Sequence, residues 1–82
     1  MQSDQLKCEI FPNPVSNTLF FSSTGNLLYN LTISSMFGQK LLEVSGVRDG
    51  YSLDFSKQLA GIYFVTISNE IGNITTKKVL KE

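Results

Sequence analysis

The sequence predicts a small all-β sandwich of about seven antiparallel strands. Short segments rich in Ile, Val, Leu, Phe, Tyr and Thr recur along the chain, separated by clusters of Gly, Asn, Asp and Ser. No window shows the sustained apolar period of 3.6 residues that an amphipathic helix needs. The 82 residues suffice for one domain with a thin core, because a chain of this size buries only about 60% of its unfolded surface.

The expected strands follow one another with glycine-containing turns between several of them. In chain order they are residues 6–11, 18–23, 30–36, 39–45, 51–55, 61–68 and 74–81. Turns of this kind often require a positive φ, which glycine adopts without steric cost. Residues 56–61 are too few for a helix beyond one turn, and Leu59 is expected to fill the edge of the sandwich there.

The two prolines lie between the first two strands. Pro12 and Pro14 lack a backbone N–H and push the residues before them toward extended geometry, so they end the first strand and direct the second. In the second strand Leu19 and Phe21 share one face. Phe20 on the other face is therefore exposed or covered by a partner.

The segment 61–68 is the best candidate for a central strand, because it is apolar on both faces. One face carries Tyr63, Val65 and Ile67, and the other carries Ile62 and Phe64.

Composition excludes several classes of function. Seven basic and seven acidic residues give a net charge of +0, which argues against nucleic-acid binding. The chain has no histidine, so nucleophiles that depend on an imidazole base and the commonest metal ligand are absent. No phosphate-binding glycine loop occurs. Asp49 and Asp54 are interpreted as turn and edge residues, and Cys8 as a small apolar residue of the first strand. We expect no catalysis, cofactor, metal or small-molecule substrate.

The last predicted strand carries three lysines, Lys77, Lys78 and Lys81, and two interpretations remain open. The lysines can form a charged edge that discourages sheet-to-sheet aggregation. Alternatively, they can form a docking strip, exposed beside Val79 and Leu80, that meets a receptor.

Four sequence motifs occur in order: "FPNPVSNTLFF" at 11–21, "LTISSMFGQKLLE" at 31–43, "YSLDFSKQLAGIYFVTI" at 51–67 and "KKVLKE" at 77–82. With them, residues 9–82 resemble the type A C-terminal sorting domain of the type IX secretion system, by which Gram-negative bacteria export proteins across the outer membrane. The residues "SSMF" before Gly38 differ from the pattern of the family, in which an aromatic residue and an Asn or Asp are common before the middle glycine turn. The residues that carry the resemblance are Pro12, Asn13, Pro14, Gly38, Gly61, Tyr63, Lys77, Lys78, Val79, Leu80 and Lys81.

The resemblance implies a non-catalytic, Ig-like β-sandwich at the end of a cargo protein. Such a domain passes through the periplasm and is recognised by the type IX translocon and its shuttle proteins. A sortase-like C-terminal signal peptidase then cuts upstream of it, and the cargo is released or joined to lipopolysaccharide at the cell surface.

For this chain the resemblance implies a sorting domain at 9–82, preceded at 1–8 by a linker remnant and the start of the first strand. The cut is expected in or before residues 1–7. Met1 is interpreted as an expression start, with the signal peptide in an N-terminal part of the precursor. The lysine-bearing strand is expected to be what a receptor reads. Its unpaired edge could add to a receptor sheet or pair with a second copy.

The alternative is an Ig-like or fibronectin-type adhesion or carbohydrate-binding module of a surface protein. Sugar binding commonly uses exposed Trp or Tyr side chains. The chain has no Trp and three tyrosines, Tyr29, Tyr51 and Tyr63, of which Tyr63 is expected to be buried.

Overall fold

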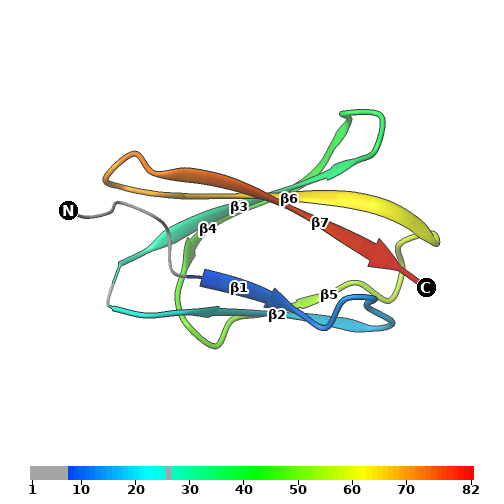
Figure 1. The fold of residues 1–82 in the computed structure, drawn as a ribbon, viewed down its shortest axis with the longest axis horizontal. Helices are drawn as coiled ribbons and strands as arrows, with labels where there is room; N and C mark the ends of the chain where they lie inside the picture. Colours follow the sequence, from blue (N-terminus) through cyan, green and yellow to red (C-terminus); the bar gives the residue numbers. More distant parts are fainter. Residues whose placement is uncertain (1–7, 26) are drawn as a thin grey trace.

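Two antiparallel sheets face each other in the computed structural model, which describes residues 8–25 and 27–82 (Figure 1). All regular structure in the described residues is β, as the sequence predicts. The strands are β1 Cys8–Phe11, β2 Thr18–Ser23, β3 Tyr29–Ser35, β4 Lys40–Val47, β5 Ser52–Asp54, β6 Gly61–Asn69 and β7 Ile74–Lys81.

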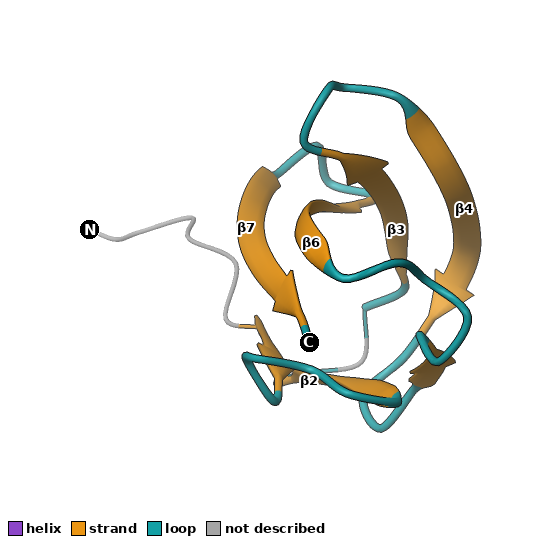
Figure 2. Cartoon of the chain, turned by 90° about the vertical axis from the view of Figure 1, so that its right-hand side faces the viewer, coloured by secondary structure: helices purple, strands orange, loops and turns teal. Residues whose placement is uncertain are grey.

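The smaller sheet has the order β1-β2-β5 and the larger one the order β4-β3-β6-β7. Figure 2 shows the larger sheet curving over the smaller one, so that the inner faces of both enclose the core. β6 lies between β3 and β7, which confirms the central position expected from its two apolar faces. The result is the Ig-like sandwich, with a three-stranded and a four-stranded layer.

Most strand boundaries lie within one residue of the sequence prediction. β2 and β7 have the predicted bounds, whereas positions 6 and 7 of the first predicted strand lie outside the described residues. β4 ends two residues later than predicted and contains two shifts of register against β3. Gly46 lies at one of these irregularities with a φ of 70°, a conformation that glycine adopts more readily than other residues.

The core is formed by the inward-facing residues of both sheets together with a few loop residues. Two aromatic pairs anchor it, Phe21 with Tyr29 and Phe55 with Tyr63, each edge to face with ring centroids 5.2 Å apart. The buried apolar residues are Cys8, Val15, Leu19, Phe21, Tyr29, Leu31, Ile33, Val47, Leu53, Phe55, Tyr63, Val65, Ile67 and Val79.

Two predictions about single side chains have opposite outcomes. Phe20 is partly exposed, as expected, and its ring stacks on Phe11 of β1 with centroids 5.8 Å apart. The expectation that Leu59 fills the edge of the sandwich is wrong, because its side chain is 82% exposed. Phe55 and Tyr63 pack at that edge instead.

Cys8 is buried in β1, in agreement with its interpretation as a small apolar residue. Burial raises the pKa of its thiol, so the folded protein disfavours the thiolate. Because the unfolded thiol loses its proton at lower pH, the stability of the fold should fall as pH rises past about 8.5. Urea unfolding at neutral and alkaline pH should show this decrease, and Cys8→Ala should reduce it; an unchanged decrease in Cys8→Ala would assign it to other groups.

The central strand should also dominate stability. Ile67 of β6 is fully buried, and truncation to alanine should lower the free energy of unfolding by about 3 kcal/mol, because a cavity replaces its side chain. Ile71 in the β6–β7 turn is 70% exposed, so Ile71→Ala should change stability by less than about 0.5 kcal/mol. Chemical denaturation of the two variants measures the difference, and equal losses would contradict the assigned core.

Candidate functional site

Part of each of the four motif segments lies at the same end of the sandwich, the end that holds residue 82 (Figure 1). We call this region the motif end. It comprises the β1–β2 loop (12–17), the β3–β4 turn (36–39), the β5–β6 loop (55–60) with the start of β6, and residues 78–82. Figure 2 views the molecule from this side.

The side chain of Asn13 binds the backbone of β7. Its Nδ2 donates to the carbonyl oxygen of Lys78 at 3.1 Å, and its Oδ1 accepts the N–H of Leu80 at 3.0 Å. An amide side chain carries both a donor and an acceptor, so it can replace a neighbouring strand at this position. Pro12 and Pro14 flank it, and both of their preceding peptide bonds are cis.

Val15 extends the same contact by main-chain hydrogen bonds. Its N–H donates to the carbonyl oxygen of Leu80 at 2.8 Å, and its own carbonyl oxygen accepts the N–H of Glu82 at 2.9 Å. The Ser16 hydroxyl donates a hydrogen bond to the Glu82 carboxylate at 2.9 Å. We call residues 13–16 the strap. Because the strap covers β7 at 78–82, the expectation of an unpaired terminal strand is wrong for this part of β7.

Tyr63 fixes the start of β6 on the other side of the motif end. Its hydroxyl donates to the carbonyl oxygen of Leu59 at 2.6 Å, while Gly61 and Tyr63 pair with Lys81 and Val79 of β7. A tyrosine that bonds back to the backbone a few residues upstream is the tyrosine corner of Ig-like sandwiches. Residues 59–63 of the third motif thus tie the β5–β6 loop to β7.

Gly38 closes the turn between β3 and β4. Its N–H donates to the carbonyl oxygen of Ser35 at 3.0 Å. Its φ of 86° lies in the left-handed region, which favours glycine. Ser35 pairs with Tyr63, so this turn lies beside the start of β6.

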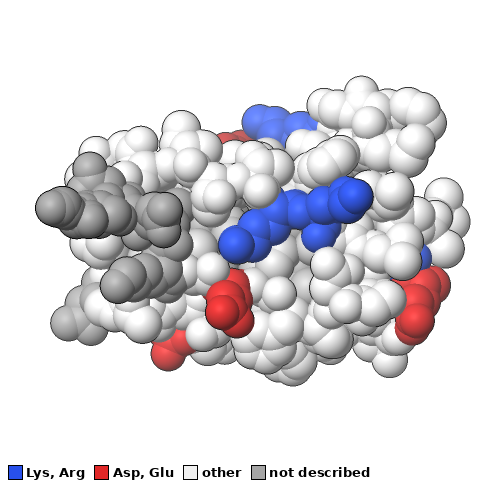
Figure 3. Space-filling model, viewed as in Figure 1, with Lys and Arg blue, Asp and Glu red and all other residues white. Residues whose placement is uncertain are grey.

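The three lysines of the last motif do not share one face. Val79 is fully buried and Lys81 is only 8% exposed, its Nζ donating to a main-chain oxygen of Glu82 at 2.9 Å. Lys77, on the same face, is half-buried, whereas Lys78 and Leu80 alternate onto the exposed face. The interpretation as a strip of exposed lysines beside Val79 and Leu80 is therefore wrong. In Figure 3 basic side chains lie in the middle of the view, with acidic ones to either side.

Exposed apolar side chains at the motif end were not anticipated from the sequence. Phe37 is 86% exposed, and Met36 and Leu59 are also largely exposed. Together with Ile62 and Tyr63 they line a shallow groove of about 220 Å³ between the β3–β4 turn and the start of β6. The signal was present, since Met36 and Phe37 occupy turn positions where polar residues are the rule.

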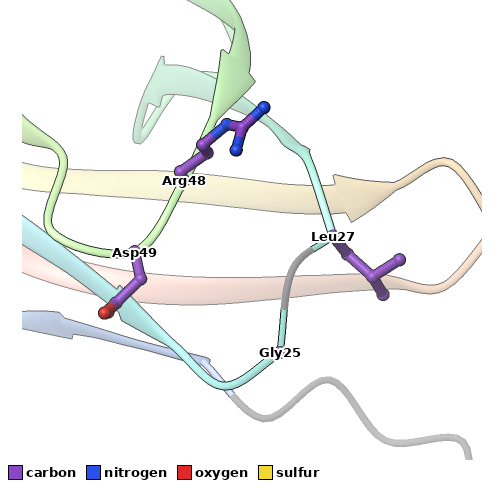
Figure 4. Close-up of a pocket in the computed structure, with 4 residues that line it drawn as sticks. All are labelled: Gly25, Leu27, Arg48 and Asp49. Atoms are coloured by element: carbon purple, nitrogen blue, oxygen red, sulfur yellow. The ribbon is translucent and has the colours of Figure 1, made fainter.

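A second hollow, of about 250 Å³, lies at the opposite end and is lined by Gly25, Leu27, Arg48 and Asp49. The side chains of Arg48 and Asp49 point in different directions (Figure 4). Oδ1 of Asp49 accepts the N–H of Ser23 at 2.9 Å.

Asp54 lies at the other end of β2 from Asp49, because it pairs with Thr18, the first residue of that strand. The Ser56 hydroxyl donates to its Oδ1 at 2.6 Å, and with the Ser56 N–H lowers the pKa of the carboxyl group. The interpretation of Asp49 and Asp54 as turn and edge residues is thus confirmed.

The described residues contain no group of three or more His, Cys, Asp or Glu side chains arranged to hold a metal ion. None of their segments forms a helix of the length and hydrophobicity needed to cross a lipid bilayer. Tyr29 and Tyr63 are buried and Tyr51 is half-buried, so no tyrosine forms an exposed platform.

The tyrosine corner gives a direct test of how this end is held. Tyr63→Phe should lower the free energy of unfolding by about 1 kcal/mol, because it removes the hydrogen bond to Leu59 and keeps the ring. Tyr51 is the matched control, since its hydroxyl makes no hydrogen bond to any described residue, and Tyr51→Phe should change stability by less than about 0.5 kcal/mol. Thermal and urea unfolding measure both; equal effects would remove the role assigned to the Tyr63 hydroxyl.

Comparison with known families agrees with these motifs. Residues 9–82 match the family model of the secretion system C-terminal sorting domain, a match that includes all four motif segments. Among curated proteins, none matches the chain. Since the match spans nearly the whole chain and the fold is the small β-sandwich that the resemblance implies, the chain belongs to the C-terminal sorting domains of the type IX secretion system.

Proposed function

We propose that the motif end is the surface by which the type IX machinery recognises this domain. Sorting domains of this family direct proteins through type IX secretion to the cell surface or the medium. The observation that carries the proposal is the convergence of the motifs. Asn13 hydrogen-bonds to β7 across 65 and 67 residues of sequence, and Gly61 pairs with Lys81.

The motif residues divide into two groups in this proposal. Asn13, Gly38, Tyr63, Val79 and Lys81 hold the shape of the motif end, because their side chains are buried or their bonds close loops. The translocon and its shuttle proteins contact the exposed groups. These are Lys78 and Leu80 on β7 and the groove residues Met36, Phe37 and Leu59.

An apolar groove suits protein recognition, and the exposed cations Lys57 and Lys78 lie at the same end of the sandwich. Exposed contiguous apolar surface on a small domain commonly marks an interaction site. Large side chains in such a patch supply most of the binding energy, and a charge at its rim steers the encounter. The domain itself performs no chemistry in this proposal, in line with the general non-catalytic character of the family.

The proposal places cleavage upstream of the fold. The domain passes the periplasm as part of a precursor, and a sortase-like signal peptidase cuts in or before residues 1–7, a segment outside the described residues. Two observations support this limit. Cys8 is already buried in β1, and β1 pairs with β2 from Cys8 to Phe11. A cut beyond Cys8 would remove a paired strand, whereas a cut before it leaves the domain folded.

An export assay tests recognition by the motif end. The chain is fused to a reporter in a bacterium that has the secretion system, and surface and periplasmic reporter are compared. The double variant Phe37→Asp/Leu59→Asp should reduce export by about tenfold, because charges replace exposed apolar groups of the groove.

Ile71→Asp is the matched control, since Ile71 is a similarly exposed apolar residue at the opposite end. It should export like the unaltered domain. Circular dichroism and thermal unfolding of the purified domains verify that all variants fold. Normal export of the folded double variant, or an equal defect in Ile71→Asp, would contradict recognition at the motif end.

A further inference from the structure

The outer face of the smaller sheet carries two aromatic rings that the core does not use. Phe11 of β1 and Phe20 of β2 are pairing partners, and their rings lie nearly parallel, with centroids 5.8 Å apart and planes inclined by 26°. The neighbouring Leu19 and Phe21 point to the other face and are buried, because side chains alternate along a strand. Phe11 is 45% exposed and Phe20 is 40% exposed. The two rings together form a small apolar surface, whereas isolated exposed apolar side chains are ordinary.

Polar side chains surround the two rings on the same face. The pairing register places five of them beside Phe20 or in the rows on either side: Ser52, Glu9 with Ser22, and Thr18 with Asp54. None of the three hydroxyl groups, nor the carboxylate of Glu9, bonds to another described residue, and Asp54 engages only Oδ1, with Ser56. An apolar centre is thus surrounded by hydrogen-bonding groups that are free to bind a ligand.

The charge of this face is negative. The strands of the smaller sheet contain no basic residue, and their only ionisable outward side chains are Glu9 and Asp54. The pKa of Asp54 is lowered, chiefly by the hydrogen bonds from Ser56 and to a smaller extent by Lys57 in the β5–β6 loop, so its carboxyl group is charged at neutral pH. An anionic ligand or an anionic lipid surface would meet like charge here.

The same face is too small and too polar for a stable protein interface. Such an interface buries about 800 Å² on each partner around an apolar centre. The three strands have four, six and three residues, and only every second residue points outward. Of these outward residues only Phe11 and Phe20 are apolar. A second copy of this chain, or another folded protein, would find too little apolar surface here.

We propose that the Phe11–Phe20 pair binds a neutral, β-linked oligosaccharide, a function that is separate from recognition at the motif end. In β-linked glucose all hydroxyl groups are equatorial, so both faces of each pyranose ring present C–H groups. These groups carry a partial positive charge and are attracted to the negative π surface of an aromatic ring. The hydroxyl groups at the edge of the sugar then bond to Ser52 and donate to the carboxylates of Glu9 and Asp54, which need no charged partner for this.

Titration of the 82-residue chain with cellohexaose, followed by NMR, tests the site. Amide chemical shifts in β1, β2 and β5 should change with a dissociation constant of about 1 mM, because two ring contacts and a few exposed hydrogen bonds leave little net free energy. Phe20→Leu keeps an apolar side chain beside Phe11 and removes the aromatic surface, so it should weaken binding about tenfold. Phe37→Leu is the matched control, since Phe37 is an exposed phenylalanine at the motif end, and it should leave the affinity unchanged. Circular dichroism verifies that both variants fold.

A second ligand tests the charge of the site without any substitution. A glucuronate hexamer with the same β-1,4 linkage keeps the C–H faces and adds carboxylates, so at low salt it should bind about tenfold more weakly than cellohexaose. Three results would overturn the proposal: no shift changes with a large excess of cellohexaose, equal binding by folded Phe20→Leu, or a preference for the glucuronate hexamer. Self-association in sedimentation equilibrium that Phe20→Leu abolishes would also overturn it, by assigning the face to a second copy. None of these measurements needs the secretion machinery.

Discussion

The motif end depends on one constraint, which is that the backbone of β7 beyond Lys78 must find hydrogen-bond partners on the side away from β6. Buried or partly buried backbone groups left without partners are costly. A loop with prolines at 12 and 14 cannot supply a regular strand, since it lacks two donors. The side chain of Asn13 supplies one donor and one acceptor to this part of β7, and the main chain of Val15 supplies another donor and another acceptor. The same contacts join the two sheets, because the strap follows β1 of the smaller sheet and binds β7 of the larger one.

Around this constraint, the structure separates hidden motif residues from exposed ones. Val15 of the strap is fully buried in the core, and Tyr63 holds the β5–β6 loop from the other side. With both sides fixed, the side chains of Lys78 and Leu80 project outward from a rigid strand. A recognition surface on a rigid strand loses little entropy when it binds. The two prolines and the lysine-bearing strand therefore belong to one structural unit.

The sequence predicted the layers well because alternation of side chains along a strand is a local property. β2 and β7 were placed to the residue, and the apolar character of both faces of β6 identified the central strand. What alternation cannot show is which loop covers a strand. Lys81 is buried because Val15 pairs beside it and because a lysine stem packs well on apolar surface. Asn13 hydrogen-bonds to partners that lie 65 and 67 positions further along the chain, and a local sequence pattern cannot predict contacts at such a separation.

The separation of these bonds in sequence has a consequence for secretion. Contacts between distant segments form only once the intervening chain is in place, because closing a long loop costs entropy before any contact compensates it. An unfolded precursor has the same motif residues, but they are not arranged around the strap. A receptor that binds the assembled motif end thus distinguishes a folded sorting domain from an unfolded one. Export of the cargo would then begin only after the sorting domain has folded.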